Sequence, residues 1–374
     1  MTFFLYLCAA LITKMVMKHF YLSFFFCLMM ALTTLCMTSA AQEHRPRVRG
    51  EAFQTETPMV HDPVMAQEGN TYYLYATGMG IQQMTSTDRK IWTVSPRPLM
   101  TVIPGWTTDS VPGFRNHVWA PDVIWWHGNW WLAYSCSTFG RNSSAIGLLS
   151  SRSLGTNLWK DEGCLVCSRE KRDNWNAIDP NFVIDDATDT PWLVWGSFWD
   201  GIQIVRLDTT MHIAQGERPR TIARRYDPFH TPSEPNPTSR YAGTNAIEAP
   251  FIFKHDGYYY LFVSWDYCCR GSKSNYRVAV GRSRAVDGPY LDYSGRDMAK
   301  GGAHSSWRVI SRNGKLRDTA LFIHSTVRIF SSAMVTARRW TVQQCLSNDP
   351  LHGRTTDGPN SCHKPFRLKD STYL

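Results

Sequence analysis

Strand-like runs rich in aromatic and β-branched residues recur along the chain, and each follows a short polar turn. The clearest runs span residues 70–77, 128–135, 190–197 and 256–264. Their turns read Gly-Asn, Asp-Thr-Pro or Asp-Gly, and further strands are indicated at residues 145–150 and 278–283. Such runs, joined by tight turns and with almost no helical periodicity, predict β-hairpins and an all-β fold.

The hairpins belong to a longer repeat. From residue 61 onward the same theme returns about every 50–70 residues, which is the size of a unit of about four strands. Units of this kind match the blades of a β-propeller. A β-sandwich is the structural alternative, but sandwiches rarely repeat a motif this closely.

Composition and charge narrow the classes of function. The chain has 374 residues, 13% of them aromatic and 15 of them Trp, which fits both a β-rich core and a sugar-binding cleft. Its net charge of +9 is concentrated after residue 300, whereas residues 42–300 balance acidic and basic residues. Because no basic face is indicated, we expect no nucleic-acid partner.

The first residues have the pattern of a secretory signal. Met17, Lys18 and His19 precede an apolar run over residues 20–35, and small residues follow at 38–41. This pattern predicts a signal peptide within residues 1–41, with Met17 as a candidate for the true start, and a secreted or periplasmic protein. A transmembrane anchor is the alternative; we expect no stable anchor.

The ten cysteines do not define a metal site. Cys164 and Cys167 form a C-x-x-C motif, but no second pair follows at zinc spacing. Cys268 and Cys269 are adjacent. Export permits disulfides, but the sequence does not give their pairing.

Three acidic residues stand out because each opens a strand-rich unit within a similar motif. They are Asp62, Asp179 and Glu248, in the motifs VHDP, NAIDPN and NAIEAP. Hydrolysis of a glycosidic bond needs one carboxyl group to protonate the leaving oxygen and one carboxylate to activate water or attack. One such acid alone would be read as a turn carboxylate; three together predict a shared catalytic site.

The pattern changes in the C-terminal part. After Gly302 the hairpin theme stops, no Glu occurs, and basic residues accumulate. Moving the reading frame back by one base permits codons for strands around an Asp-Gly turn. We therefore expect propeller blades over residues 42–300 and an aberrant tail over 301–374, produced by a frameshift near Lys300. A disordered or novel tail is the alternative.

The acid motifs, together with residues 119–123, 196–202, 268–271 and 276–283, resemble glycoside hydrolase family 43, in particular its secreted bacterial endo-1,5-α-L-arabinanases. The resemblance covers about residues 55–300. It implies a five-bladed β-propeller, with the fifth blade disrupted here, and an inverting hydrolase of α-1,5-arabinofuranosidic bonds. Arabinan or arabino-oligosaccharides are the implied substrates.

The resemblance also implies roles for the acids. Asp62 corresponds to the general base, Glu248 to the general acid, and Asp179 to a third acid that tunes Glu248 and orients the sugar. A general acid must stay protonated near neutral pH, so burial or neighbouring carboxylates must raise its pKa. The expected substrate contacts are Phe139, Gly140, Asn176, Trp195, Ser197 and Phe198, although core packing is the alternative for Trp195 and Phe198. His61, Trp119 and Asp122 are expected to brace the scaffold.

The family pattern includes a fifth-blade His that helps to hold an ion, often calcium, in the central channel. That His is absent from the chain as written, so no metal ligand is predicted, and the chemistry requires no cofactor. We expect a monomer. An exo-acting arabinofuranosidase or β-xylosidase of the same family and a non-catalytic carbohydrate-binding propeller are the alternatives.

Overall fold

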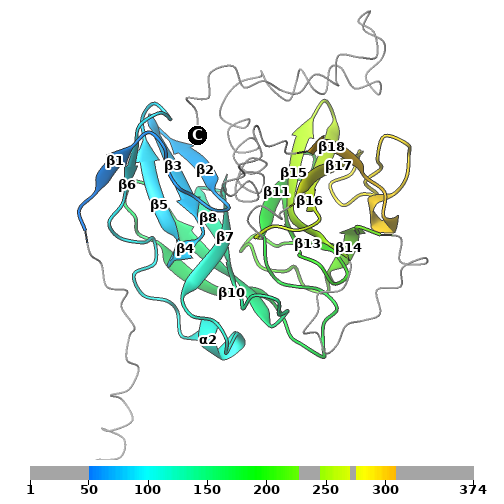
Figure 1. Ribbon diagram of the computed structural model, residues 1–374, viewed down its shortest axis with the longest axis horizontal. Coiled ribbons are helices and arrows are strands. Elements are labelled where there is room, and N and C mark those ends of the chain that lie inside the picture. Colours follow the sequence, from blue (N-terminus) through cyan, green and yellow to red (C-terminus); the bar gives the residue numbers. More distant parts are fainter. Residues whose placement is uncertain (1–49, 227–244, 270–274, 309–374) are drawn as a thin grey trace, which may run out of the picture. The chain divides into compact units, whose positions relative to one another are not determined.

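The computed structural model describes residues 50–226, 245–269 and 275–308 (Figure 1). The predicted signal peptide and the tail after residue 308 lie outside the described residues. Of the helices within the described part, none is long and apolar enough to cross a membrane.

The described residues form four antiparallel sheets (Figure 1). The first has the order β1-β6-β5-β3-β2, with bounds β1 Phe53–Thr55, β2 Val64–Glu68, β3 Thr71–Ala76, β5 Gln82–Ser86 and β6 Trp92–Val94. The second has the order β10-β9-β8-β7-β4, with bounds β4 Gly78–Met79, β7 His117–Trp126, β8 Asn129–Cys136, β9 Ser144–Ser151 and β10 Lys160–Ser168.

The other two sheets follow the chain order. The third consists of β11 Asn181–Asp185, β12 Thr190–Trp195, β13 Ile202–Arg206 and β14 Arg220–Ala223. The fourth consists of β15 Ile247–His255, β16 Tyr258–Trp265, β17 Arg277–Ser283 and β18 His304–Arg308. The short helices α2 (Trp106–Ser110) and η2 (Met298–Lys300) lie in connections. The all-β prediction is confirmed.

Tight turns build the hairpins within the sheets. Asp256 and Gly257 both have positive φ, 46° and 73°, and join β15 to β16. His127 and Gly128, at 47° and 77°, likewise join β7 to β8. Two consecutive residues with positive φ make a type I′ turn, whose twist matches that of the paired strands. The local sequence therefore sets the register of these hairpins.

The sheets pack against one another in chain order. Their innermost strands are in contact from β2 to β7, from β7 to β11 and from β11 to β15. Buried apolar clusters join successive sheets and contain, in chain order, Tyr75 with Leu132, Leu148 with Leu193, and Ile204 with Leu261. Successive four- or five-stranded sheets with neighbouring innermost strands form a β-propeller arrangement, of which four blades are described.

The fourth blade extends past the boundary expected at residue 300. Strand β18 pairs with β17, and His304 lies opposite Val280. Residues 304–308 therefore complete the fourth sheet instead of belonging to a separate tail. The run lacks the turn and aromatic pattern of the other strands, and its place in the sheet depends on a partner strand that is distant in sequence.

One backbone feature repeats in all four blades. A residue with positive φ stands directly before a proline at Asp62 (47°), Ala120 (38°), Asp179 (58°) and Ala249 (52°). Residues other than glycine rarely adopt this backbone conformation, which costs each of them about 1–3 kcal/mol. Each such residue precedes or interrupts the innermost strand of its blade. We refer to these four positions as the blade kinks.

Asp122 braces the second blade against the third, as expected. Its buried carboxylate accepts hydrogen bonds from the Phe182 amide at 2.7 Å and from Asn181 Nδ2 at 3.2 Å. Asn181 in turn accepts one from the amide of Ile252 in the fourth blade at 2.9 Å. A single carboxylate thus supports the alignment of three innermost strands.

Replacing Asp122 with Ala is expected to lower the free energy of unfolding by about 2–4 kcal/mol, since two buried donors lose their acceptor. Urea unfolding measures the change. Asp109, which is exposed on α2, provides the matched control as Asp109→Ala. Equal unfolding midpoints for the two variants would show that the brace is dispensable.

Candidate active site

The three predicted acids lie at the innermost strands of three different blades. Asp62 precedes β2, Asp179 precedes β11 and Glu248 lies near the start of β15. All three are buried, with 4%, 5% and 8% of their surface exposed. Buried carboxyl groups are uncommon unless they are paired or functional.

Asp62 is held by two residues of its own blade. Its Oδ2 atom accepts a hydrogen bond from Thr77 Oγ1 at 2.9 Å and lies 3.3 Å from His61 Nε2. Thr77 also accepts a hydrogen bond from the amide of Ala120, the blade kink of the second blade, at 2.9 Å. The Thr77 hydroxyl therefore fixes the Asp62 carboxylate against the second blade.

Asp179 connects the second, third and fourth blades. Its amide donates a hydrogen bond to Ser135 Oγ at 3.0 Å. Its Oδ2 atom accepts one from the amide of Ala249 at 3.1 Å. Because Ala249 follows Glu248 directly, this hydrogen bond links Asp179 to the segment that carries Glu248.

Glu248 is positioned by the third blade. Its Oε2 atom accepts a hydrogen bond of 2.7 Å from Ser197 Oγ, and the two residues also form an isolated antiparallel bridge. A bulge in β15 follows Glu248 and contains the kink at Ala249. Bulges re-aim a side chain relative to the regular strand.

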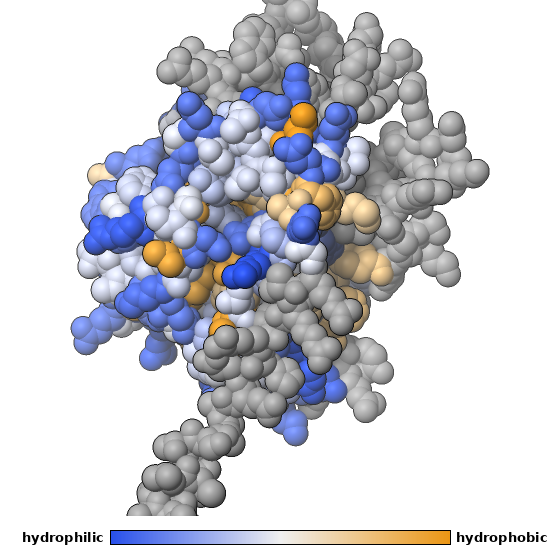
Figure 2. Space-filling view, turned by 90° about the vertical axis from the view of Figure 1, so that its left-hand side faces the viewer, coloured by the Kyte–Doolittle hydropathy of each residue, from blue (hydrophilic) through white to orange (hydrophobic). Residues whose placement is uncertain are grey.

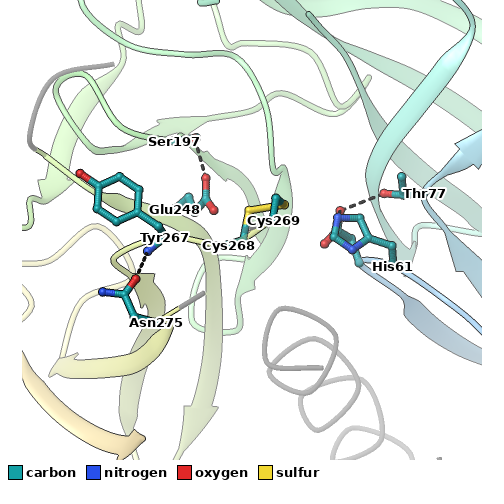
Figure 3. The surroundings of a disulfide bond; sticks show 9 residues. His61, Thr77, Ser197, Glu248, Tyr267, Cys268, Cys269 and Asn275 are labelled. Atoms are coloured by element: carbon teal, nitrogen blue, oxygen red, sulfur yellow. Dashed lines mark hydrogen bonds and ion pairs between the residues drawn. A yellow bond between two sulfur atoms is a disulfide. The ribbon is translucent and has the colours of Figure 1, made fainter. Parts of the chain in front are cut away.

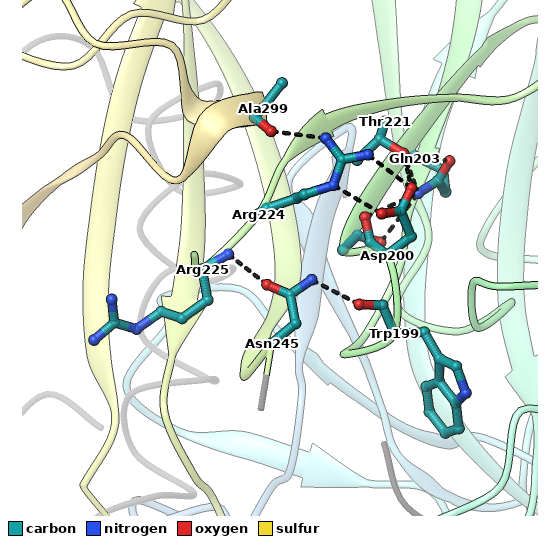
Figure 4. A network of polar contacts seen from close by, with 9 residues as sticks. Trp199, Asp200, Gln203, Thr221, Arg224, Arg225, Asn245 and Ala299 are labelled. Atoms are coloured by element: carbon teal, nitrogen blue, oxygen red, sulfur yellow. Dashed lines mark hydrogen bonds and ion pairs between the residues drawn. The ribbon is translucent and has the colours of Figure 1, made fainter. Parts of the chain in front are cut away.

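A polar network anchors the segment that leads to Glu248 (Figure 4). Asn245 Nδ2 donates to the Trp199 carbonyl at 2.7 Å, and Asn245 Oδ1 accepts from the Arg225 amide at 2.6 Å. Nearby, the Asp200 carboxylate accepts two hydrogen bonds from the guanidinium of Arg224, at 2.7 and 2.9 Å. Asn245, the first residue of the NAIEAP motif, is thus bound to two backbone groups of the third blade, one before β13 and one after β14.

The predicted substrate contacts differ in their exposure and in the groups that they contact. Ser197 binds the Glu248 carboxylate, so it positions an acid. Phe198 follows it with a φ of 56°, and its ring centroid lies 5.8 Å from that of Tyr267. Asn176 is 3% exposed. Phe139 and Gly140 are exposed, and 78% of Phe139 is accessible.

Trp195 does not fit the expected contact with substrate. Its side chain is fully buried and packs in the apolar cluster between the second and third blades. The Trp175 ring lies edge-on to it at 5.5 Å. Because β12 alternates its side chains between two faces, Trp195 points into the core and stabilises the sheet packing.

The described surface in Figure 2 is mostly hydrophilic, with apolar residues in smaller patches. Large exposed apolar side chains include Trp125 and Phe139. Scattered residues of this kind are ordinary on a protein surface. Exposure alone therefore does not mark a substrate contact.

Two positioning residues, Thr77 and Ser135, were not predicted. Both stand at the end of the second strand of a blade, in the runs Tyr-Ala-Thr and Ala-Tyr-Ser. The signal was visible as a small hydroxyl residue that ends each run. Only the structure shows that these hydroxyl groups accept hydrogen bonds from the next blade's kink.

His117 borders Asp62 and was not predicted either. Desolvation and the neighbouring His61 lower its pKa, while the Asp62 carboxylate opposes this shift. Trp119 Nε1 donates a hydrogen bond to His117 Nδ1 at 2.9 Å, which fits the neutral ring. Desolvation and His61 therefore outweigh the Asp62 carboxylate and favour the neutral form of the His117 ring.

The lowered pKa of His117 predicts acid sensitivity. The unfolded chain binds a proton at His117 more readily than the folded protein does, so stability falls as pH drops below about 6.5. His117→Gln should lose less of its melting temperature between pH 8 and pH 5.5 than the parent protein does. Parallel melting curves across this range would contradict the assignment.

Comparisons with known proteins place the chain in a family. A family model described as glycosyl hydrolases family 43 matches residues 57–316. An extracellular endo-alpha-(1->5)-L-arabinanase of Bacillus subtilis (strain 168) is 41% identical over 248 residues, which cover 65% of this chain and 71% of that protein. An extracellular exo-alpha-(1->5)-L-arabinofuranosidase of Cellvibrio japonicus (strain Ueda107) is 42% identical over 248 residues, covering 65% and 69%.

Solved structures give the same result. An exo-1,5-alpha-L-arabinanase from a bovine ruminal metagenomic library matches with a TM-score of 0.61 and 50% identity, over 68% of this chain and 80% of that one. An alpha-L-arabinanase of Cellvibrio cellulosa in complex with arabinohexaose matches with a TM-score of 0.62 and 39% identity, over 68% and 79%. The predicted resemblance is confirmed: the chain belongs to glycosyl hydrolases family 43 and is a glycoside hydrolase.

Proposed function

We propose that this protein hydrolyses α-1,5-linked arabinan with inversion of configuration. The observation that carries the proposal is the group of three buried acids at the innermost strands of the first, third and fourth blades, each held by a hydroxyl or amide hydrogen bond. The names of the relatives supply the substrate class, since they are described as arabinanases and an arabinofuranosidase.

The acids divide the chemistry between them. Glu248 protonates the departing sugar oxygen, and Asp62 takes a proton from the attacking water. The sequence neighbours of Glu248 are apolar and buried, which gives it the surroundings that a general acid requires. They are Ala246, Ile247, Ala249 and Phe251. Asp179, through the amide of Ala249, orients the segment that carries Glu248.

Endo action is the proposed mode. The relatives include one endo-acting and one exo-acting protein at nearly equal identity, so product analysis must distinguish the two. Incubation with debranched arabinan should release reducing ends and give mixed oligosaccharides early in the reaction. Arabinose as the sole early product would support exo action, and release from xylan alone would support a β-xylosidase.

A non-catalytic, carbohydrate-binding propeller is the second candidate. It is favoured by the absence of the family's fifth-blade His from the sequence. Binding of arabinan without any release of reducing ends would support it.

A fifth blade encoded in the shifted frame is part of the proposal. Ser264 supports it, since Ser264 lies opposite Glu248 as Ser135 lies opposite Trp119. Ser135 accepts a hydrogen bond from the next blade, whereas buried Ser264 Oγ has no hydrogen-bond partner among the described residues. Sequencing the gene across codons 300–302 tests the frameshift; nucleotides that forbid the shifted reading would end it.

The proposed chemistry uses the three acids and requires no cofactor. Secretion is proposed from the signal pattern and from the relatives described as extracellular. Mass spectrometry of protein exported by a bacterial host would identify the cleavage point.

A further inference from the structure

A disulfide joins the adjacent residues Cys268 and Cys269. In Figure 3 it lies between Glu248 on one side and His61, the neighbour of Asp62, on the other. Cys268 is partly buried against the apolar cluster that contains Phe251, whereas Cys269 is exposed. The bond therefore presents one side to solvent in the region that the acids border.

The chain leading to the disulfide is firmly held. The amide of Asp266 donates to the Ala246 carbonyl at 2.9 Å. Its carboxylate accepts hydrogen bonds from Arg277 Nε at 2.7 Å and from Arg225 Nε at 3.2 Å. Tyr267 exchanges hydrogen bonds of 3.1 Å with Asn275 (Figure 3). The disulfide thus projects from an anchored support.

The connection contributes little to the stability of the whole fold. A disulfide stabilises a protein mainly by closing a loop in the unfolded chain, and its effect increases with loop length. Here the bridged residues are neighbours in sequence, so the loop is as short as it can be. Its role must therefore be sought in its immediate surroundings.

The chemistry of the pair suits a sugar ring. Two sulfur atoms and their Cβ atoms form an apolar, polarizable surface of fixed shape. Such a surface can pack against the C–H face of a furanose ring without needing a hydrogen-bond partner. Two separate thiols would rotate independently and would present no fixed surface.

We propose that the Cys268–Cys269 disulfide positions the sugar residue between Glu248 and Asp62. The inference rests on the proposed function, because it assigns the disulfide to the arabinan-binding site. Reduction would break the S–S bond with two electrons and two protons from a dithiol such as dithiothreitol, which becomes a cyclic disulfide. The positioning surface would then be lost.

The test compares the full-length parent protein with Cys268→Ser/Cys269→Ser, each on a Cys164→Ser/Cys167→Ser background. The background prevents dithiothreitol from acting on the C-x-x-C pair. The expected KM for debranched arabinan rises about tenfold in the variant, the size of effect that loss of a small apolar contact produces. Its kcat should change less, and the melting temperature should stay near that of the background.

Dithiothreitol should raise the KM of the disulfide-bearing protein to the variant's value and leave the variant unchanged. The tryptic peptide spanning residues 255–270 should be two hydrogens lighter before reduction. Unchanged KM in the variant, with activity intact, would overturn the positioning role and leave the proposed function standing.

Binding of arabinohexaose, measured by calorimetry, separates the remaining outcomes. If the disulfide-bearing protein binds but does not cleave, and the variant binds about tenfold more weakly, the positioning role stands and hydrolysis fails. Equal binding in that case overturns the positioning role as well. Absence of both binding and cleavage would overturn both proposals.

Discussion

Glu248→Gln is expected to reduce kcat on debranched arabinan by about 10²–10⁴-fold, the usual contribution of a general acid. Gln has nearly the same shape and can still accept the hydrogen bond that Ser197 Oγ now donates to Glu248 at 2.7 Å. It cannot deliver a proton to the departing oxygen. The fold should therefore survive, with a melting temperature close to that of the parent protein.

The leaving group makes the test of Glu248 specific. An aryl arabinofuranoside with an acidic phenol needs no protonation, so the variant should lose much less activity on it than on arabinan. Glu56→Gln, at an exposed position, is the matched control and should behave as the parent does. Equal losses on both substrates would assign Glu248 a role other than general acid.

Asp62→Asn is expected to lower kcat by a similar factor, about 10²–10⁴-fold, for a different reason. Asn can keep the hydrogen bond from Thr77 Oγ1, which is 2.9 Å long in the parent, but it cannot take a proton from water. An acidic leaving group should not restore activity, because activation of water is still missing.

The two substitutions together distinguish the acid from the base. The ratio of activity on the aryl substrate to activity on arabinan should rise for Glu248→Gln and stay near the parent value for Asp62→Asn. Asp88→Asn, at an exposed turn, serves as the control for the second variant. Parent-like turnover by Asp62→Asn would transfer the base role to another residue.

Local sequence signals predicted most of the described fold. The Asp-Gly turn at Asp256 and Gly257 and the aromatic runs around it are short-range features, and their hairpin formed as expected. Strand β4 was not predicted: Gly78 and Met79 leave the first blade and pair with β7 of the second. Two residues carry too little pattern to reveal a partner that lies almost forty positions away.

The sequence predicted the acids of the candidate site but not the residues that position them, Thr77 and Ser135. Asp62, Asp179 and Glu248 stand in repeated motifs, so the sequence marks them directly. The partnership of Thr77 with Ala120, or of Ser135 with Asp179, depends on which blades become neighbours. For Trp195, an aromatic residue near an acid motif fits a core position and a sugar contact equally well until burial is known.

The blade kinks bear on how such a site can evolve. Ala120 has a positive φ like Asp62 and Asp179, and its amide binds the preceding blade as that of Asp179 does, although it carries no acid. The strained conformation therefore belongs to the repeated blade, whatever side chain occupies the kink. A duplicated blade needs only a one-residue substitution to gain or lose a carboxylate at this position. In the first and third blades the kink carries an acid, whereas in the fourth blade the acid Glu248 stands directly before the kink.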